Sequence, residues 1–401
     1  MNSQVQSPQQ LFTSAQTAHQ AGHFDVAESA YRALLQQLPN DADTLHFLGL
    51  LRFQRGEQQE GVDWLRKSLA AAPNNPHAWN NLGNMLVAQD QSQEAAAAYE
   101  RATELAPDLV QAWYNLGICY RRSKRIDDSV SAFCKAVALQ PSDTMVYERF
   151  GMLLYGLGRF KDAADIYRKW LQLEPANATA RHMLAAMTGE AVPERADDEF
   201  LKRLFDGFAS NFDEQLAALG YRAPELLVSA LGDHVRSDGQ LVVLDAGCGT
   251  GLCGVLLRSM TRHLVGVDLS AGMVAKAQER KLYDELEVAE LCEFMRSRPA
   301  AFDVVISADT LVYFGALAEA FTAARGCLRP GGTLAFTLER LNNPPDSKVG
   351  FAIQPHGRYA HTEEYLRSNL QAAGFNSVNC RDVVLRKERG QDVAGYLVVA
   401  S

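Results

Sequence analysis

The sequence has no excess of basic residues. Its 401 residues include 39 lysines and arginines against 48 aspartates and glutamates, which gives a formal net charge of −9. Neither half of the chain is basic. Proteins that bind nucleic acid through its phosphates usually carry a basic surface. The composition therefore argues against nucleic acid as a partner or substrate.

The chain also lacks paired cysteines and long apolar runs. Its 7 cysteines include no Cys-x-x-Cys pair, and no cysteine and histidine cluster has metal-ligand spacing, so we expect reduced thiols and no metal. No stretch approaches the ~18 apolar residues of a membrane span. The first residues have neither the basic start nor the apolar run of a signal peptide. We expect a soluble, cytoplasmic protein that makes no membrane contact.

What the first half does contain is a regular repeat. Pro39, Pro73, Pro107, Pro141 and Pro175 are spaced by 34 residues in every interval. This is the period of the tetratricopeptide repeat, a helical hairpin. After a flexible tail at 1–7, we expect five repeats and a capping helix, at 8–41, 42–75, 76–109, 110–143, 144–177 and 178–189.

The internal positions of the repeats fit helix packing. In the third repeat, Gly83 and Ala95 are small enough for its two helices to approach closely, and Tyr99 is expected to fill the space between neighbouring helix pairs. Stacked hairpins form a superhelix whose first helices line a groove. The polar candidates for a peptide contact in that groove are Asn80, Asn81, Asn84, Asn115, Arg121, Arg122 and Arg149. The alternative is that they form a solvated helix face.

A different pattern begins after a charged segment at 190–197, which we interpret as a linker before a domain at 198–401. Residues 241–251 indicate a buried strand that runs into a glycine-rich turn. A second apolar strand ends at Asp268, and Ser270 is placed to cap a helix at 271–283. Glycines let the turn approach an anionic ligand, and Asp268 can accept hydrogen bonds from ribose hydroxyls. The glycine-rich turn and Asp268 together predict a nucleoside cofactor.

Two cofactor classes use this geometry. Gly249, Gly251 and Gly254 formally match the dinucleotide fingerprint G-x-G-x-x-G, which would indicate a nicotinamide oxidoreductase. In that fingerprint the first glycine ends the strand. Here the strand ends two positions earlier, at Asp245-Ala246-Gly247, and this frame favours a methyltransferase.

The segment from Asp245 to Gly251, with Asp268 and Met273, resembles the class I S-adenosylmethionine-dependent methyltransferases. Residues 288–291, 302–309 and 328–332 resemble the later strand tips of that family. The resemblance implies an α/β, Rossmann-like domain with a mainly parallel seven-stranded sheet, closed by a hairpin near 377–387 and 391–400. With its all-α superhelix, the whole chain resembles bacterial predicted methyltransferases that carry tetratricopeptide repeats.

The same resemblance implies the cofactor contacts. The predicted S-adenosylmethionine site comprises Tyr221, Asp245, Ala246, Gly247, Cys248, Gly249, Gly251, Asp268, Leu269, Met273, Glu290, Leu291 and Asp309. Tyr221 is the candidate for the methionine carboxylate. Glu290, where many relatives carry aspartate, is the candidate for the adenine amino group, with the Ala289 amide as the alternative. Residues 205–213 and 219–221 resemble an aromatic segment that closes over the cofactor, although plain packing would explain them equally well.

Three residues are candidates for contact with the methyl acceptor. Asp309 and Tyr313 follow the fourth strand, and His361 is a candidate general base. The alternative for His361 is a surface or capping position, because a helix at 362–373 begins beside it. Arg358 is a second-choice contact for an anionic substrate.

No Asn-Pro-Pro-Tyr tetrad follows the fourth strand, which argues against methylation of DNA bases or glutamine. The related run at 342–345 follows the fifth strand, and we interpret it as a turn.

The sequence therefore predicts transfer of a methyl group from S-adenosylmethionine to an oxygen or nitrogen nucleophile, with the repeats recruiting a protein partner or a polypeptide substrate. One alternative is a scaffold that binds the cofactor with little turnover. Another is a small-molecule methyltransferase that uses its repeats to oligomerise.

Overall fold

The computed structural model describes residues 7–232, 239–342, 349–388 and 390–401. Most of the predicted tail at 1–7, and the predicted turn at 342–345 beyond its first residue, lie outside the described residues. Contacts divide the chain into two compact units, Met1–Ile166 and Tyr167–Ser401. Within the described ranges, no helix combines the length and apolar character needed to cross a bilayer.

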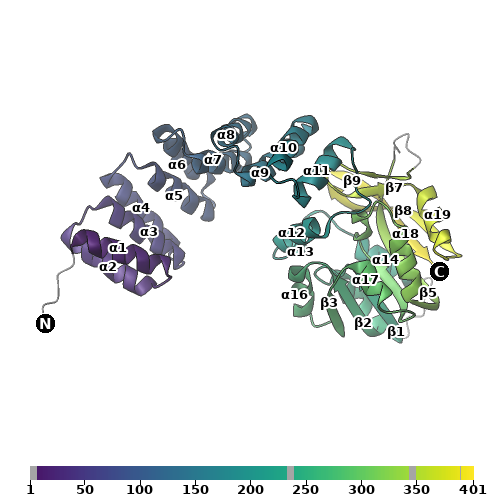
Figure 1. Ribbon diagram of the computed structural model, residues 1–401. Helices are drawn as coiled ribbons and strands as arrows, with labels where there is room; N and C mark the ends of the chain where they lie inside the picture. The colour runs from purple at the N-terminus through teal and green to yellow at the C-terminus, as the bar shows by residue number, and fades with distance from the viewer. Residues whose placement is uncertain (1–6, 233–238, 343–348, 389) are drawn as a thin grey trace. The chain divides into compact units, whose positions relative to one another are not determined.

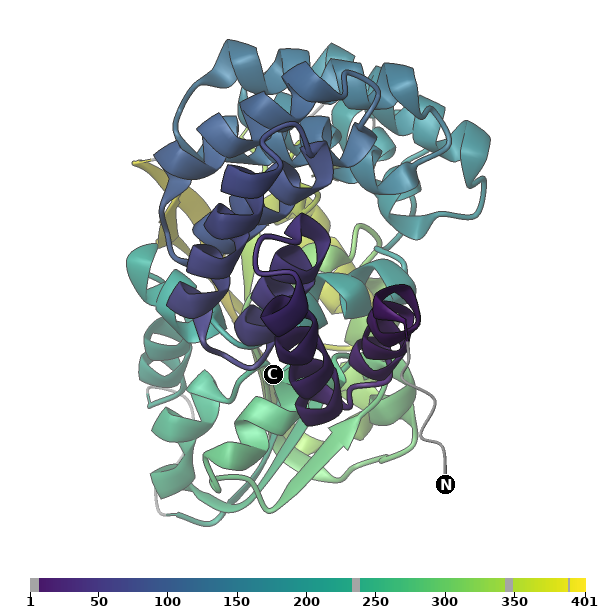
Figure 2. The same cartoon turned by 90° about the vertical axis from the view of Figure 1, so that its left-hand side faces the viewer.

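The first unit consists of helix pairs, one pair in each predicted repeat (Figures 1 and 2). The all-helical prediction is confirmed. The helices are α1 (Pro8–Gln20), α2 (Phe24–Gln37), α3 (Ala42–Gln54), α4 (Gln58–Ala71), α5 (Pro76–Ala88), α6 (Ser92–Leu105), α7 (Val110–Arg122), α8 (Ile126–Leu139), α9 (Thr144–Gly156) and α10 (Phe160–Leu173). The last of these continues into the second unit.

The repeat period sets where the helices begin. Two residues after four of the five prolines, an aspartate or asparagine caps the next helix through its side chain. These caps are Asp41, Asn75, Asp143 and Asn177. Each cap satisfies a backbone amide that has no partner inside the helix.

The predicted close approach of the two helices at a glycine is confirmed in the third and fourth pairs, where an aromatic ring of the same pair lies against that glycine. A Cβ atom on Gly83 would lie 2.5 Å from the ring of Tyr99, and one on Gly117 would lie 3.0 Å from the ring of Phe133. Tyr99 is 2% exposed, and its hydroxyl donates to Asn84 Oδ1 at 2.7 Å. The ring is therefore fixed where the missing side chain of Gly83 leaves room.

The second unit is an α/β domain preceded by a helix. Its helices are α11 (Ala178–Thr188), α12 (Asp198–Phe208), α13 (Phe212–Ala218), α14 (Ala223–Gly232), α15 (Leu252–Leu257), α16 (Ala271–Glu279), α17 (Leu291–Arg296), α18 (Ala318–Cys327) and α19 (Glu363–Ala372). Its strands are β1 (Leu241–Ala246), β2 (Thr261–Asp268), β3 (Glu285–Val288), β4 (Phe302–Ser307), β5 (Leu328–Arg340), β6 (Phe351–Ile353), β7 (Tyr359–His361), β8 (Val378–Glu388) and β9 (Gln391–Ala400).

The sheet has the predicted mainly parallel core. Strands β3, β2, β1, β4 and β5 are parallel neighbours in that order, and β9 pairs antiparallel with both β5 and β8. These seven strands, two of which form the terminal β8–β9 hairpin, confirm the prediction. A short hairpin that was not predicted, β6–β7, extends the sheet where β7 pairs with the end of β5. Ser270 caps α16 as predicted, although that helix ends earlier, at Glu279.

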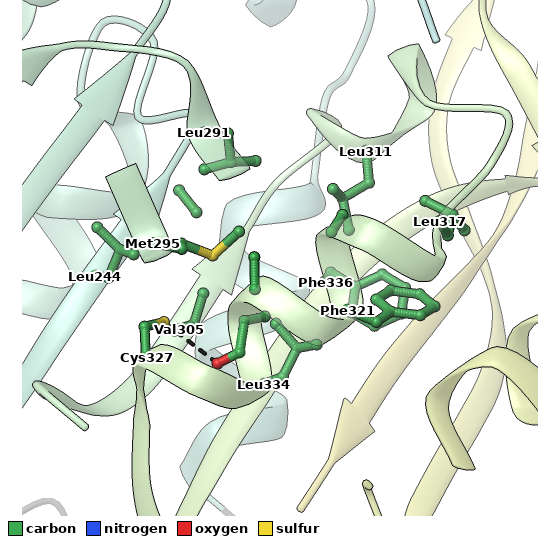
Figure 3. Packing of buried hydrophobic residues seen from close by; sticks show 14 of the residues in the cluster. Leu244, Leu291, Met295, Val305, Leu311, Leu317, Phe321, Cys327, Leu334 and Phe336 are labelled. Carbon is green, nitrogen blue, oxygen red and sulfur yellow. Dashed lines mark hydrogen bonds between the residues drawn. The ribbon is translucent and has the colours of Figure 1, made fainter. Parts of the chain in front are cut away.

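Helices cover both faces of the sheet, which explains why the strands are almost continuously apolar. On one face Leu244, Val305 and Phe336 pack against α17 and α18 (Figure 3). On the other face Val243 and Val304 pack with α14 and α15. Successive residues of one strand thus enter two different cores.

The close approach at Gly83 gives a test of the repeat packing. We expect Gly83→Ala to lower the free energy of unfolding by on the order of 1 kcal/mol, because overpacking costs about 1–3 kcal/mol and outweighs the gain of about 1 kcal/mol in helix propensity. Gly156→Ala is the matched control, since a Cβ there has no neighbour within 4 Å. Denaturant unfolding followed by circular dichroism measures both variants. Equal stabilisation by both would contradict the packing account.

Candidate cofactor site and active site

A pocket lies at the carboxyl ends of the parallel strands, where the loops after β1, β2, β3 and β4 meet. Most of the residues predicted from the sequence line it. They are Tyr221, Gly247, Cys248, Gly249, Asp268, Leu269, Met273, Glu290, Leu291, Asp309 and Tyr313. Four predicted residues, Asp245, Ala246, Gly251 and His361, are not among its lining residues.

The turn after β1 forms one wall of the pocket. Gly247, Gly249 and Gly251 have φ values of +82°, +54° and +89°, which side chains disfavour. A Cβ atom on Gly247 would lie 2.0 Å from Thr310 Oγ1. Glycine is therefore required at 247 both for the backbone conformation and for the space beside Thr310.

Asp268 joins this turn to the end of β2. Its Oδ2 accepts the Gly249 amide and its Oδ1 accepts the Ser270 amide, each at 2.9 Å. Burial raises the pKa of the Asp268 carboxyl, and the two amides oppose that rise. Each carboxylate oxygen keeps a further lone pair, as a contact with ribose hydroxyls requires.

Asp245 lies behind the turn, at the end of β1. Its Oδ2 accepts the Tyr283 hydroxyl at 2.6 Å. Its Oδ1 is buried and has no hydrogen-bond partner among the described residues. Burial raises the pKa of Asp245 to about 7. A positive charge bound at the turn would stabilise the ionised form, so this orphaned oxygen fits a cationic ligand.

Glu290 occupies the predicted adenine end of the pocket. Its Oε2 accepts the Glu293 amide at 2.8 Å, which caps α17, and its Oε1 accepts Arg195 Nη1 at 2.6 Å. The alternative contact, the Ala289 amide, already donates to the Asp268 carbonyl oxygen at 3.1 Å. The Ala289 amide has only one N–H, and that N–H is already hydrogen-bonded at the edge of the sheet. This contact corrects the alternative assignment of the adenine to Ala289.

At the other end of the pocket, Asp309 belongs to a buried ionic network. Asp309 has φ +50° and accepts Thr337 Oγ1 at 2.6 Å and Arg386 Nη1 at 3.0 Å. Arg386 is 3% exposed and also binds Glu339 and Glu388. Arg358 binds the same two glutamates. Burial raises the pKa of the Asp309 carboxyl, and the charge of Arg386 and the Thr337 hydroxyl oppose that rise. Because both of its oxygens are held by these partners, we interpret Asp309 as a positioning group rather than a base.

Two tyrosines from different parts of the chain line the pocket. Tyr221 precedes α14, and Tyr313 lies in the 3-10 turn Leu311–Tyr313 after β4. Burial raises the pKa of both phenols above the usual value. Both are therefore neutral and able to donate a hydrogen bond at physiological pH.

The proposed base, His361, lies elsewhere. It is fully buried on β7, its Nε2 is 3.0 Å from the Gly315 carbonyl oxygen, and its ring stacks on Tyr365 at 5.7 Å. Burial lowers its pKa to about 4. The catalytic prediction for His361 is corrected, because the ring packs inside the fold. Thr362, not His361, caps the following helix α19.

Helices α12 and α13, which include most of the aromatic segment, supply an apolar wall of the pocket. Leu201, Phe205, Phe212 and Leu216 line the pocket. Two carboxylates attach these helices to the cofactor loops. Asp206 accepts the Gly272 amide at 3.1 Å and the Ser270 hydroxyl at 2.5 Å, and Asp213 accepts the Thr250 hydroxyl at 2.5 Å. Both anchors hold the helices against the loops after β1 and β2.

Comparisons with known proteins agree with this division. Residues 243–332 match the family model of a methyltransferase domain, and residues 12–76 and 80–144 match that of a tetratricopeptide repeat. A phosphoethanolamine N-methyltransferase of Triticum aestivum is 33% identical over 146 residues, covering 35% of this chain and 29% of that protein. A malonyl-[acyl-carrier protein] O-methyltransferase of Enterobacter lignolyticus (strain SCF1) is 32% identical over 131 residues, covering 32% and 52%.

The chain thus spans less than two thirds of the length of these two curated relatives. Among solved structures, the crystal structure of MamA protein is 26% identical and covers 42% of this chain and 92% of that one, with a TM-score of 0.39. The fold and the pocket define a class I methyltransferase domain. This chain carries that domain at its carboxyl end, after tetratricopeptide repeats.

The buried histidine gives a test that separates packing from catalysis. Because the folded pKa of His361 is about 4 and its ordinary value is 6.5, the unfolded chain binds the proton first. The stability that the neutral, buried His361 contributes is therefore lost as the pH falls from 6.5 to 4.

We expect His361→Asn to be less stable at pH 7.5 by about 1–3 kcal/mol and to lose less stability on acidification than the parent. Denaturant titrations at several pH values measure this difference. Loss of methyl transfer with unchanged stability would restore a catalytic role for His361.

Proposed function

We propose that this protein transfers a methyl group from S-adenosylmethionine to an oxygen or nitrogen nucleophile. The observation that carries the proposal is the joint wall formed by the left-handed glycine turn and Asp268 at two adjacent strand ends. A glycine turn whose backbone a ligand can approach closely, and a carboxylate with spare lone pairs, suit the amino-acid tail and the ribose of one nucleoside. The methyltransferase family match over residues 243–332 supports the same cofactor.

The pocket offers a contact for each part of that cofactor. The turn at 247–249 and Tyr221 would hold the methionine end, with Asp245 contributing charge from behind. Asp268 would hold the ribose, and Glu290 with Leu291 the adenine. When bound, the cofactor supplies an electrophilic methyl group on a sulfonium. The protein then needs mainly to align the nucleophile and to exclude water.

The residues of the acceptor side support an acceptor that needs no strong base. Each carboxylate that lines the described pocket already has a hydrogen-bond partner, namely Asp198, Asp268, Glu290 and Asp309. No histidine belongs to the described lining. An amine lone pair, or an oxygen that is ionised at neutral pH, meets this requirement. In this proposal Tyr313 orients the acceptor, and the apolar side chains of α12 and α13 exclude water.

We further propose that the repeats bind a protein partner or a polypeptide substrate. Asn115 Nδ2 donates to both Asn80 Oδ1 and Asn84 Oδ1 at 3.0 Å, which links the third and fourth repeats. Asn81 Nδ2 lies 2.9 Å from His46 Nε2, which links the second and third. Asn80 is only 7% exposed, so it supports the network from within. Both Nδ2 protons of Asn115 are used in this network, so Asn81 and Asn84 are the candidates to contact an extended chain.

Calorimetry tests the cofactor proposal. We expect the full chain to bind S-adenosylmethionine and S-adenosylhomocysteine, and Asp268→Ala to weaken both by about tenfold or more, because it removes hydrogen bonds to a charged acceptor. Glu279→Gln is the control, since this exposed residue on α16 pairs only with Lys276 among the described residues. Absence of binding by the parent chain would contradict the proposal. Binding without any release of S-adenosylhomocysteine in cell extract would favour a scaffold.

Methyl labelling tests the role of the repeats. We expect the parent chain to transfer radiolabelled methyl groups to a polypeptide in extract, and Asn81→Ala with Asn84→Ala to reduce that labelling by about tenfold, since each lost amide contact costs about 0.5–1.5 kcal/mol. Gln93→Ala, an exposed position on the second helix α6, is the control. Labelling of small metabolites alone would indicate that the repeats do not deliver the substrate.

A further inference from the structure

The segment just before α12 forms backbone hydrogen bonds with the loop that carries Tyr313. The Ala196 amide donates to the Tyr313 carbonyl at 2.8 Å, and the Gly315 and Ala316 amides both donate to the Glu194 carbonyl at 2.7 Å. Arg195 and Phe314 form an antiparallel bridge between them. On the other side, the Tyr359 hydroxyl donates to the Pro193 carbonyl at 2.8 Å. Residues 193–196, predicted as part of a linker, are therefore fixed on the catalytic domain.

This anchoring directs the Arg195 side chain into the pocket. Its Nη1 lies 2.6 Å from Glu290 Oε1, its Nη2 binds Asp198, and its guanidinium carbon lies 5.6 Å from the centre of the Phe314 ring. Both ends of the Arg195–Glu290 pair line the pocket. The Glu290 side chain is 13% exposed, and that of Arg195 is 34% exposed. The pair thus closes the wall where the adenine of the cofactor is expected.

Glu290 is consequently held at both of its oxygens. The Glu293 amide binds Oε2 at the start of α17, and Arg195 binds Oε1. A glutamate has one more rotatable bond than the aspartate often found at this place, so a single cap would leave its carboxylate more conformational freedom. The second contact fixes the orientation of the carboxylate before a ligand arrives, which reduces the entropy lost on binding.

We propose that Arg195 is a positioning residue for the adenine ring: it holds the Glu290 carboxylate where that group accepts a hydrogen bond from the 6-amino group of the purine. The inference rests on the proposed function, because it requires a nucleoside donor in this pocket. It assigns a cofactor role to a residue that precedes the methyltransferase core.

The ionised state of Glu290 in the Arg195–Glu290 pair determines which purine the pocket prefers. Burial opposes ionisation of Glu290, but the amides of Glu293 and Cys292 and the charge of Arg195 together lower its pKa. An ionised carboxylate can only accept hydrogen bonds. It binds a purine that carries an amino group at C6 and repels one that carries a carbonyl oxygen there. The pair should therefore discriminate adenosine from inosine.

The test compares two ligands that differ only at that position. Dissociation constants of S-adenosylhomocysteine and of its 6-oxo analogue, S-inosylhomocysteine, are measured by calorimetry with the full chain. We expect the parent to prefer the adenosine compound by about tenfold or more, since an unpaired or repelled polar group costs about 1–3 kcal/mol. Arg195→Gln should reduce that preference to about threefold or less, because Glu290 is then no longer held in place.

The variants separate positioning from folding. Arg195→Lys keeps the charge without the planar geometry, so we expect an intermediate preference. If the two residues act together, adding Arg195→Gln to Glu290→Gln should cause no further loss of the preference for S-adenosylhomocysteine over S-inosylhomocysteine. Arg298→Gln is the matched control, because Arg298 pairs with Glu285 and Glu287 and does not line the pocket.

Two results would overturn the inference alone. They are an unchanged preference in Arg195→Gln, or equal weakening of both ligands by that variant while circular dichroism shows a native fold. Failure of the parent chain to bind either ligand would overturn the proposed function together with the inference.

Discussion

The hydrogen bond from the Gly249 amide to the Asp268 carboxylate ties the ends of two neighbouring strands together. It depends on the parallel register that places Ala246 beside Val267 and on a backbone turn that only glycine adopts without strain. The sheet, covered by helices on both faces, makes that register rigid. The anchors of α12 and α13 attach to the two loops that this junction joins, and Thr310 packs against Gly247 in the first of them.

Much of this could be predicted from the sequence because the signals are local or periodic. The 34-residue interval gives the helix pairs, and each cap lies a fixed distance from its proline. Apolar runs gave the strands, because both faces of the sheet are buried. Asp268 and the glycines were identified because chain order alone places adjacent strand ends together in a parallel sheet. The domain boundary at 190–197 and the individual ligand contacts stay predictions.

The rest depends on contacts between distant residues. Arg386 follows Asp309 by 77 positions, and Arg195 precedes Glu290 by 95. Neither arginine belongs to a motif, so composition and spacing gave no signal for them. His361 shows the opposite error, since a histidine next to a predicted helix start looked accessible. Its actual surroundings come from β7 and the 313–316 loop, whose pairing no local pattern reveals.

The attachment of residues 193–196 has a consequence for how this protein can be divided. A fragment cut at residue 198 would lose the carbonyl that accepts two loop amides, and it would also lose the packing of His182 against Phe200 and the Gly357 carbonyl. Exposed backbone groups of this kind favour pairing with other chains. Recombinant versions of the carboxy-terminal domain should accordingly begin before α11, so that the edge of the 313–316 loop keeps its native cover.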